Sequence, residues 1–374
     1  MKSDLHLALF LTRAVPLWRW DELGILEREV ALYLRLRPRL AGLSIVTDGG
    51  VEELRYQERL PGIRILCNRW GLSPNLYSLL APFLHWRALR EATVYKTNQL
   101  DGAWTALIAG RIHRKPVVVR AGYAWALNFC RDQGNTRKTR LIRCLEGWML
   151  CRADRVVITT PSLREYIMRE CGVPAERVTV ISNYVDTRRF CPLPDARPEA
   201  GRVVFVGTFN NAKNLPTLFR AVALVPAARL MLIGDGSLRV QLEALAGELG
   251  IAGRVTFAGR MNHSQLPDML NRAQVFALTS HYEGHPKALI EAMACGVAVV
   301  GTDVDGIRDV IRHKETGLLC PPTPEGIAVA LSRLLENVAW REKLGRAARE
   351  FVVQEYSLKR VVEQELAMLA QASR

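Results

Sequence analysis

Short apolar runs alternate with longer segments of helical periodicity along the chain, and this alternation predicts the fold. In the first half, the runs predicted to be strands are Leu7–Leu11, Leu43–Val46, Ile63–Leu66, Thr93–Tyr95, Val117–Val119, Arg155–Ile158 and Val178–Ile181. Segments of helical period, such as Asp21–Leu36 and Asp101–Ile112, fill most of the gaps. Runs of Val and Ile separated by helices are typical of a parallel sheet that is covered by helices on both faces.

A proline-rich segment between Ser182 and Ala200 interrupts this alternation and has the composition of a linker. The second set of predicted strands follows it: Val203–Val206, Leu230–Ile233, Val255–Phe257, Val275–Leu278 and Val297–Val300. Helices are expected to begin near Lys213, Ser237, Ser264 and Pro286, and the tail from Thr323 is almost wholly helical. The pattern predicts two doubly wound, Rossmann-like α/β domains, at 1–187 and 201–352, joined by a linker at 188–200. Their strand ends are expected to face each other across a ligand-binding cleft.

The composition of the 374 residues, 49% hydrophobic and 24% charged, is that of a globular protein. No apolar run reaches the roughly 18 residues of a membrane span, and the first residues are expected to form a buried strand, not a signal peptide. The eight cysteines include no C-x-x-C pair, which argues against a disulfide framework and a zinc site. We therefore expect a protein of the reducing cytoplasm.

The segment 280–296 carries two glutamates, Glu283 and Glu291, on either side of a Gly-His-Pro sequence. Proline is favoured at the first position of a helix, so a helix is predicted from about Pro286 to Cys295. Glu283 then lies in the loop before the helix, and Glu291 lies within the helix. The backbone amides that follow Glu283 would form an anion site at the helix N-terminus. The two acids therefore bracket a phosphate-sized gap and are not a side-by-side acid–base pair.

Six segments together resemble the retaining glycosyltransferases of family 4, which have the GT-B fold. The first is Glu283 and Glu291 with Gly284 and Pro286 between them. The others are Ile181-Ser182-Asn183-Tyr184-Val185-Asp186 with Phe190; Phe205-Val206-Gly207 with Lys213-Asn214; Leu232-Ile233-Gly234-Asp235-Gly236; Phe257-Ala258-Gly259-Arg260; and Gly301-Thr302-Asp303 with Gly306 and Thr316-Gly317-Leu318-Leu319. The resemblance covers about residues 155–355 well and the first 150 loosely. It implies a C-terminal helix, at 353–374, that packs back on the N-terminal domain.

The resemblance implies a role for each matching residue. Glu291 would bind the ribose hydroxyls of a nucleoside-diphosphate sugar, Glu283 would support the charge that develops at the anomeric carbon, and Lys213 would neutralise the leaving diphosphate. Glu283 and Lys213 are thus the predicted catalytic residues. The predicted donor-binding residues are Gly207, Thr208, Arg260, Gly284, His285, Lys287, Ala288, Leu289 and Glu291. No metal or other cofactor is expected, because lysine and backbone amides neutralise the diphosphate in this family.

Three features depart from the family pattern. Thr208 stands where an arginine usually follows the glycine, so one cation is missing unless Arg202, Arg260 or an arginine of the first half replaces it. The first strand leads to Arg13-Ala14-Val15-Pro16-Leu17-Trp18-Arg19-Trp20 where the family has a paired-glycine loop. Arg120 follows the fifth predicted strand, where a histidine is common. The predicted acceptor-side residues are Arg120, Trp18 and Arg19.

Simpler interpretations exist for several of these residues. Glu283 and Glu291 could be a helix-cap acid and a surface acid. His281 and His285 are four residues apart, but the proline after them keeps them off one helix, so we do not expect a metal pair. The sequence Asp303-Val304-Asp305 has the form of a D-x-D metal motif, but it follows a strand where the family has a turn.

Charge and amphipathic segments raise the question of a membrane surface. Residues 1–190 contain 30 Lys and Arg against 18 Asp and Glu, and seven of the eight tryptophans. In the segment 136–152, apolar residues recur at steps of three and four among cations; they are Leu141, Cys144, Leu145, Trp148 and Met149. Residues 71–90 carry aromatic side chains among Leu and Ala. Each segment is compatible with core or with membrane contact, and an ordinary arginine-rich surface also explains the charge. The net charge favours contact with anionic lipid.

These observations lead to one expected function with two alternatives. We expect a retaining glycosyltransferase that moves a sugar from a nucleoside-diphosphate sugar to an anionic, lipid-linked or polysaccharide acceptor, held by the N-terminal domain at the cytoplasmic membrane face. The alternatives are a GT-B-fold sugar-nucleotide epimerase and a non-catalytic relative that binds nucleotide or lipid. Nucleic-acid binding is not expected, since no recognition motif accompanies the basic charge.

Overall fold

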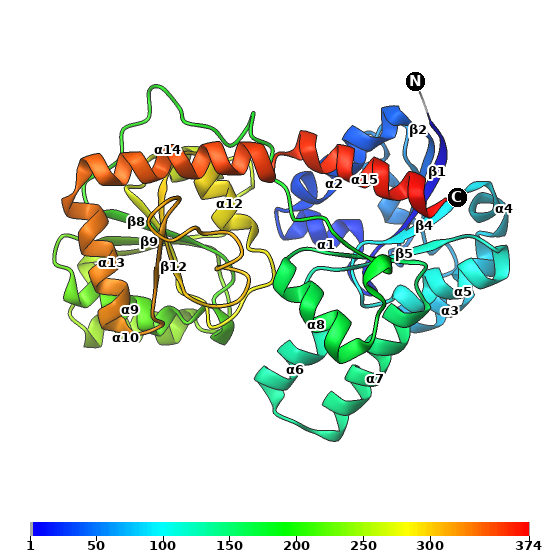
Figure 1. Ribbon diagram of the computed structural model, residues 1–374, viewed down its shortest axis with the longest axis horizontal. Helices are drawn as coiled ribbons and strands as arrows, with labels where there is room; N and C mark the ends of the chain where they lie inside the picture. The colour runs from blue at the N-terminus through cyan, green and yellow to red at the C-terminus, as the bar shows by residue number, and fades with distance from the viewer. Residues whose placement is uncertain (1–2, 374) are drawn as a thin grey trace. The chain divides into compact units, whose positions relative to one another are not determined.

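Figure 1 shows the computed structural model, which describes residues 3–373. The chain divides into two compact units: unit 1 contains the residues up to Ser182 and the chain from Val361 on, and unit 2 is Asn183–Arg360. Each unit is built on one parallel sheet, which confirms the two α/β domains predicted from the sequence. The sequence pattern placed the end of the first domain at 187, and the family resemblance placed the start of the C-terminal helix at 353.

Within the described residues, the sheet of unit 1 has seven parallel strands in the order β3-β2-β1-β4-β5-β6-β7. Their bounds are β1 Ser3–Phe10, β2 Leu40–Val46, β3 Arg64–Leu66, β4 Val94–Thr97, β5 Val117–Ala121, β6 Arg155–Ile158 and β7 Val178–Val180. Each strand predicted in the first half overlaps one of them. The strand order reverses its direction at β1 and β4, which pair through Leu7 and Val94.

The helices of unit 1 are α1 Leu17–Glu22, α2 Leu26–Leu36, α3 Pro74–Leu84, α4 Trp86–Glu91, α5 Ala103–His113, α6 Trp125–Gln133, α7 Arg137–Arg152 and α8 Pro161–Cys171, with α15 Leu358–Ala372 belonging to unit 1 from Val361 on. The single helix predicted for 21–36 is wrong, because α1 and α2 are separate. Gly24 between them has a left-handed backbone (φ 68°), a conformation that ends helices and that glycine adopts without strain.

Adjacent residues of β4 face opposite sides of the unit 1 sheet. Tyr95 is buried in an apolar core under α3, α5, α7 and α8. Lys96 points to the other side, where its ammonium group lies over the ring of Tyr33 in α2 and contacts α15. In Figure 1, α15 accordingly lies beside α2.

A buried ion pair fastens α15 to the sheet of unit 1. The Lys96 ammonium group lies 2.6 Å from both carboxylate oxygens of Glu365, and both side chains are 0% exposed. The guanidinium of Arg120 is 3.6 Å from the same carboxylate. Burial lowers the pKa of Lys96, and the Glu365 carboxylate opposes this effect. The pair lies among buried apolar side chains of the same helix, Val361, Val362, Met368 and Leu369, which pack with it on unit 1.

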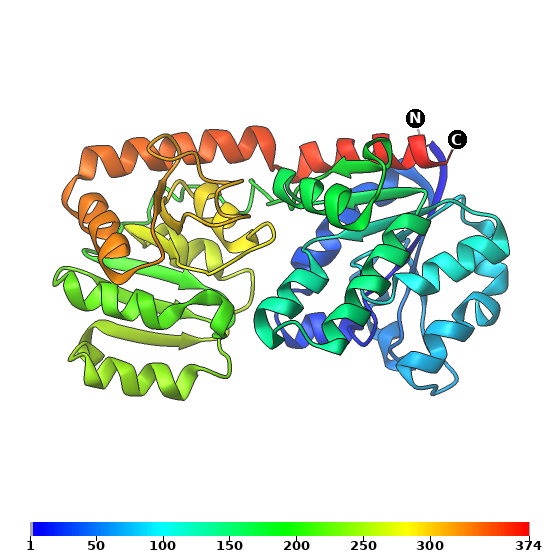
Figure 2. The same cartoon turned by 60° about the horizontal axis from the view of Figure 1, so that its bottom comes forward.

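Unit 2 has helices on both faces of its sheet (Figure 2). In the described chain this sheet has six parallel strands in the order β10-β9-β8-β11-β12-β13. The strands are β8 Arg202–Val206, β9 Arg229–Ile233, β10 Val255–Gly259, β11 Val275–Leu278, β12 Ala298–Thr302 and β13 Leu318–Cys320. The helices are α9 Leu215–Leu224, α10 Arg239–Glu248, α11 Leu266–Asn271, α12 Lys287–Ala294, α13 Pro324–Glu336 and α14 Val338–Glu355. Strand β13 was not among the strands predicted from the sequence.

The strand order of unit 2 reverses between β8 and β11, which are neighbours in the sheet and pair through Val203 and Val275. In doubly wound sheets, ligands bind beyond the carboxyl ends of the strands at such a reversal. The loops that follow β8 and β11 are therefore the place to look for a site. None of the helices in residues 3–373 is long and apolar enough to cross a membrane.

Candidate active site

The reversal point of unit 2 brings two loops together. One loop, 207–213, follows β8, and the other, 279–286, follows β11. The amide of His281 donates a hydrogen bond to the carbonyl of Ala212 (2.8 Å), which joins the two loops through their backbones. Side chains far apart in the sequence thus meet at the carboxyl edge of the sheet.

The two predicted catalytic residues form an ion pair where these loops meet. The ammonium nitrogen of Lys213 lies 2.5 Å from Oε1 of Glu283. The hydroxyl of Ser280 donates a hydrogen bond of 2.6 Å to the same carboxylate oxygen. The side chains of Lys213 and Glu283 are 21% and 11% exposed, so the pair is fixed by its surroundings and still reaches solvent. Ser280 was not singled out from the sequence, although it begins the segment that contains Glu283.

The helix predicted after Glu283 is α12, and its N-cap residue is Pro286 (φ −74°, ψ 106°). The first amides of an α-helix have no acceptor within the helix and point out of its N-terminus. Pro286 offers no side-chain cap, and the Glu283 loop leads directly into α12. The start of a helix is a place where anions bind. Leu289 is fully buried, so its side chain belongs to the core, and its predicted part in donor binding stays a prediction.

The loop before α12 is held by contacts from elsewhere in unit 2. The side-chain amide of Asn183 donates a hydrogen bond of 2.7 Å to the carbonyl of His285, and the His285 ring lies edge-on against Tyr356, with 4.8 Å between centroids. Gly306 has a left-handed backbone (φ 80°), and a Cβ there would collide with the carbonyl oxygens of Glu283 and Gly284. The loop after β12 therefore packs directly on the backbone of the site, which explains why a glycine is needed.

Glu291, the predicted ribose-binding residue, lies inside α12 and is only 2% exposed. Its Oε1 is 2.8 Å from Nε2 of His263, which is also buried and packs against Phe190, with 4.9 Å between ring centroids. The sequence carried no signal for His263, because the residue precedes α11 and meets α12 only in the folded chain. The His263 ring fixes the orientation of the Glu291 carboxylate.

Thr208 and Arg260, two further predicted donor-binding residues, are exposed at carboxyl ends of strands. Thr208 follows β8 directly after Gly207, and Arg260 follows β10. Arg202, considered from the sequence as a replacement for the missing cation, lies at the opposite, amino end of β8 and pairs with Glu199. The suggestion for Arg202 is therefore wrong, and Arg260 stays as the candidate in this unit.

In unit 1, the N-terminus of α1, the helix after β1, is capped by a carboxylate of the protein itself. The buried Glu53 accepts hydrogen bonds from the amides of Leu17 (2.8 Å) and Trp18 (3.0 Å), at the start of α1. Burial raises the pKa of Glu53, and the two amides oppose the rise. The N-terminus of α1 is therefore occupied by Glu53, where the family has its paired-glycine loop. Arg19 on the same helix is exposed and pairs with Glu22 (2.6 Å).

Arg120, the other predicted acceptor-side residue, is largely buried at the end of β5. Its guanidinium lies near the carboxylate of Glu365, and its amide donates a hydrogen bond to the hydroxyl of Thr97 (3.0 Å). Through its contact with Glu365, Arg120 takes part in the packing of α15 on the sheet. Its predicted part in acceptor binding stays a prediction.

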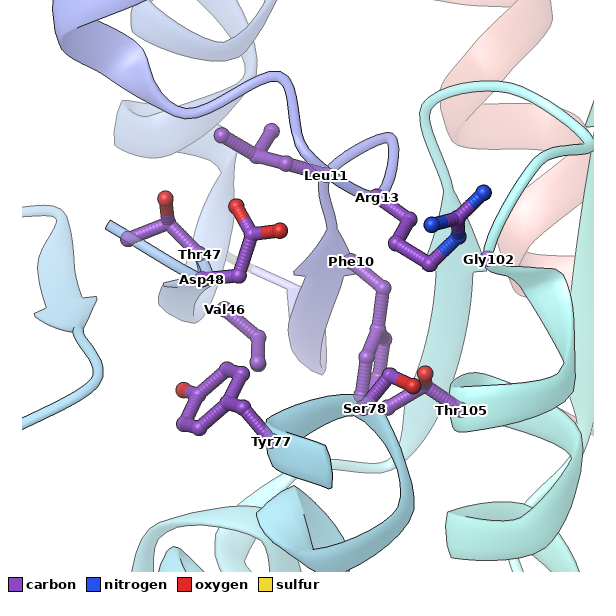
Figure 3. A pocket seen from close by; sticks show the side chains of 10 residues that line it. All are labelled: Phe10, Leu11, Arg13, Val46, Thr47, Asp48, Tyr77, Ser78, Gly102 and Thr105. Atoms are coloured by element: carbon purple, nitrogen blue, oxygen red, sulfur yellow. The ribbon is translucent and has the colours of Figure 1, made fainter. Parts of the chain in front are cut away.

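Figure 3 shows a small cavity at the carboxyl ends of β1 and β2, with a volume of about 20 Å³. Arg13 and Asp48 are among the residues that line it. Asp48 accepts a hydrogen bond from the amide of Ala14 (2.5 Å), and burial raises the pKa of its carboxyl group. Arg13 pairs with Asp101 at 3.2 Å. A cavity of this size holds about one water molecule, so it does not accommodate a sugar.

The Asp303-Val304-Asp305 segment makes ion pairs within the protein. Arg308 binds Asp303 at 2.6 Å and lies 3.7 Å from Asp305. Among the side chains that the structure describes, no group of three or more His, Cys, Asp or Glu is arranged to hold a metal ion. The Lys213–Glu283 pair and the start of α12 are therefore the chemical features around which the candidate site is built.

Comparison with known proteins gives two family matches that together span most of the chain. The family described as glycosyl transferases group 1 matches residues 195–351, and the family described as Glycosyltransferase Family 4 matches residues 32–189. The curated proteins similar to this chain include the lipopolysaccharide core biosynthesis glycosyltransferase LpsE of Rhizobium meliloti, 32% identical over 58% of this chain and 64% of that protein. Glycogen synthase of Mycobacterium tuberculosis is 26% identical over 58% of this chain and 54% of its own length. The chain thus spans between about half and two thirds of these relatives.

Solved structures resemble the chain over almost its whole length. Anabaena HepE in complex with UDP has a TM-score of 0.79 and 17% identity, covering 98% of this chain and 100% of that one. Sucrose-phosphate synthase from Thermosynechococcus elongatus has a TM-score of 0.79 and 22% identity, covering 98% of both chains. At these identities the likeness shows a shared fold, the GT-B fold that the sequence predicted.

Proposed function

Because the chain belongs to the glycosyltransferase family of group 1, we propose that it transfers a sugar, with retention of anomeric configuration, from a nucleoside-diphosphate sugar to an acceptor hydroxyl. The observation that carries the proposal is the Lys213–Glu283 ion pair (2.5 Å), set beside the N-terminus of α12 at the strand reversal of unit 2. A cation and helix amides suit a diphosphate, and a carboxylate suits a sugar that develops positive charge.

The proposed reaction balances without a metal ion or a separate base. The bond between the anomeric carbon and the diphosphate oxygen breaks, and the diphosphate leaves with the electron pair. The acceptor oxygen bonds to the same face of that carbon, and its proton passes to the departing diphosphate. Lys213 and the α12 amides stabilise the diphosphate charge, while Glu283 stabilises the positive charge on the sugar. Glu291, oriented by His263, binds the ribose hydroxyls.

The proposed acceptor is an anionic or lipid-linked molecule or a polysaccharide, and it is bound through unit 1. The net charge of +12 in residues 1–190 supports an anionic partner, and similarity to a lipopolysaccharide core glycosyltransferase supports an acceptor of the cell envelope. We place the protein in the cytoplasm, at the inner face of the plasma membrane, without a metal cofactor. Similarity to a HepE structure that holds UDP supports a uridine nucleotide among the candidate donors.

A donor panel with labelled sugars tests this function. The protein is incubated with UDP-, GDP- and ADP-sugars, with and without a membrane lipid and polysaccharide extract, and in the presence of EDTA. We expect labelled product and free nucleoside diphosphate only with extract, and no loss of rate with EDTA. Conversion of the sugar nucleotide without extract would favour an epimerase, and binding without turnover in any mixture would favour a non-catalytic protein; either result contradicts the proposal.

A further inference from the structure

Helix α3 of unit 1 carries large apolar side chains on its solvent face. Leu76, Leu79, Leu80 and Phe83 recur at steps of three and four, so they share one side of the helix, and Leu79 and Phe83 are 52% and 56% exposed. The opposite side of α3 is already buried in the core of unit 1. Trp86, at the start of α4, extends the exposed row and is also exposed. We call these five residues the apolar ridge.

A second exposed row lies on α7, where Leu141, Leu145 and Trp148 point to solvent. The sequence left this segment open between core and membrane contact, and of the five apolar residues named there only Met149 is buried, together with Ile142 and Leu150 of the same helix. Helices α3, α5 and α7 pack side by side on the same face of the sheet, as Figure 1 shows. Both exposed rows therefore belong to one outer layer of helices in unit 1.

A basic groove of about 920 Å³ borders this layer, formed by the end of α5, the start of β5, the end of α7, and Ala372 and Ser373 at the end of α15. The cations that line it are Arg111, Arg114, Lys115 and Arg152. Trp148 of the α7 row also lines the groove, and the Trp86 ring of the ridge contacts His113 beside it, with 4.5 Å between centroids. The acid in the lining, Asp154, accepts a 2.7 Å hydrogen bond from the amide of Val117. The apolar ridge, the basic groove and the exposed row on α7 thus form one continuous surface.

The layer is predominantly basic, and the exposed acid at the end of α4, Glu91, is paired with Arg64 (3.0 Å). The segments 69–90, 103–115 and 137–152 together contain eleven Lys and Arg and a single acid, Glu146. Glu146 is buried, and its carboxylate accepts hydrogen bonds from the amides of Trp125 (2.7 Å) and Ala126 (3.3 Å). The Glu146 carboxylate therefore lies inside the unit and does not add negative charge to the exposed surface. What faces solvent is apolar and aromatic surface interleaved with cations.

We propose that this layer docks on the surface of an anionic bilayer, with the apolar ridge and the α7 row in the interfacial region and the basic groove around a phosphate-bearing lipid headgroup. The inference rests on the membrane contact included in the proposed function and assigns it to named residues. Exposed apolar patches of this kind mark interaction sites. Tryptophan is favoured at membrane interfaces, and Lys and Arg near an anionic surface strengthen binding. A protein partner would need acids to match the groove, whereas anionic lipids provide phosphates at high density.

Vesicle flotation with the full chain tests the docking surface. We expect binding to vesicles of phosphatidylcholine with phosphatidylglycerol, weaker binding in high salt, and little binding to phosphatidylcholine alone. The double variant Leu79→Glu with Phe83→Glu should lower the partition coefficient at least tenfold, and Arg111→Glu with Lys115→Glu should remove most of the salt dependence. The matched control, Leu224→Glu with Val240→Glu, changes two exposed apolar residues of unit 2 and should bind as the wild type does. Circular dichroism checks that each variant is folded.

Three results would overturn the docking surface. The ridge variant could bind as tightly as the wild type, the wild type could bind both kinds of vesicle equally, or sedimentation could show a dimer that the ridge variant dissociates, which would make the layer an interface between copies. Nucleotide binding in unit 2 is measured on the same variants and should be unchanged. The two measurements therefore separate the two claims. A failure of vesicle docking with intact nucleotide binding would overturn this inference and leave the proposed function standing.

Discussion

Replacing Lys213 or Glu283 with alanine is expected to reduce the rate of sugar transfer by between about tenfold and about 100-fold, while the protein stays folded. Removing one preorganised group that stabilises charge in a transition state commonly costs on the order of 100-fold in rate. Each variant also leaves its partner without the 2.5 Å ion pair that holds both side chains at the junction of the two loops. The measurement is the initial rate of labelled product at saturating donor.

The matched control for Lys213→Ala is Lys343→Ala, which removes an exposed lysine of α14 in the same unit. Its rate should equal that of the wild type. Because Lys213 and Glu283 act on one ligand and on each other, the double variant should lose less than the product of the two single losses. Unchanged rates in both single variants would contradict the assignment of the site.

Replacing Glu365 with alanine is expected to destabilise the protein more than any exposed substitution on α15. The change leaves Lys96 buried without its carboxylate, and breaking a buried ion pair from one side costs about 3–5 kcal/mol. For a unit of this size such a loss lowers Tm by about 10 °C. Thermal unfolding followed by circular dichroism measures the shift.

Two comparisons separate the buried pair from general damage to α15. Glu363 lies on α15 as well, and its carboxylate forms an exposed ion pair with Arg39 (2.9 Å). Glu363→Ala removes that pair and should shift Tm little, since solvent screens it. The double variant Lys96→Met with Glu365→Leu removes both charges and should recover most of the lost stability. Equal melting temperatures for Glu365→Ala and Glu363→Ala would show that the buried pair does not fasten the helix.

Local patterns predicted most strands of the two sheets and the start of α12, while the site residues came from the family resemblance. Strands are recognisable as short Val and Ile runs, and Pro286 marks the start of α12 through its own backbone restriction. Lys213 and Glu283 were assigned from a family resemblance and stand next to each other in the structure, although 70 positions separate them. Gly207 and Gly284, two of the predicted donor-binding residues, lie in the same two loops as Lys213 and Glu283.

Partners that meet only through the tertiary fold were not predictable. His263 binds Glu291, Glu53 caps α1, and Glu365 binds Lys96, and no spacing rule links the members of these pairs. The division between α1 and α2 was missed because apolar periodicity continues across Gly24. The exposure of the α3 and α7 rows was also undecided, since an apolar stripe has the same spacing whether it faces a core or a membrane.

Nucleotide binding at the start of α12 tests the central claim most directly. The Tm of the wild type is measured with UDP, GDP and ADP and their sugar derivatives, and again for Lys213→Ala. A ligand at 100 times its Kd adds about 2.7 kcal/mol to the stability of the unit that binds it. We predict that one nucleoside diphosphate and its sugar derivative raise Tm by several degrees in the wild type and by clearly less in Lys213→Ala. No shift with any nucleotide, or equal shifts in both proteins, would contradict the account.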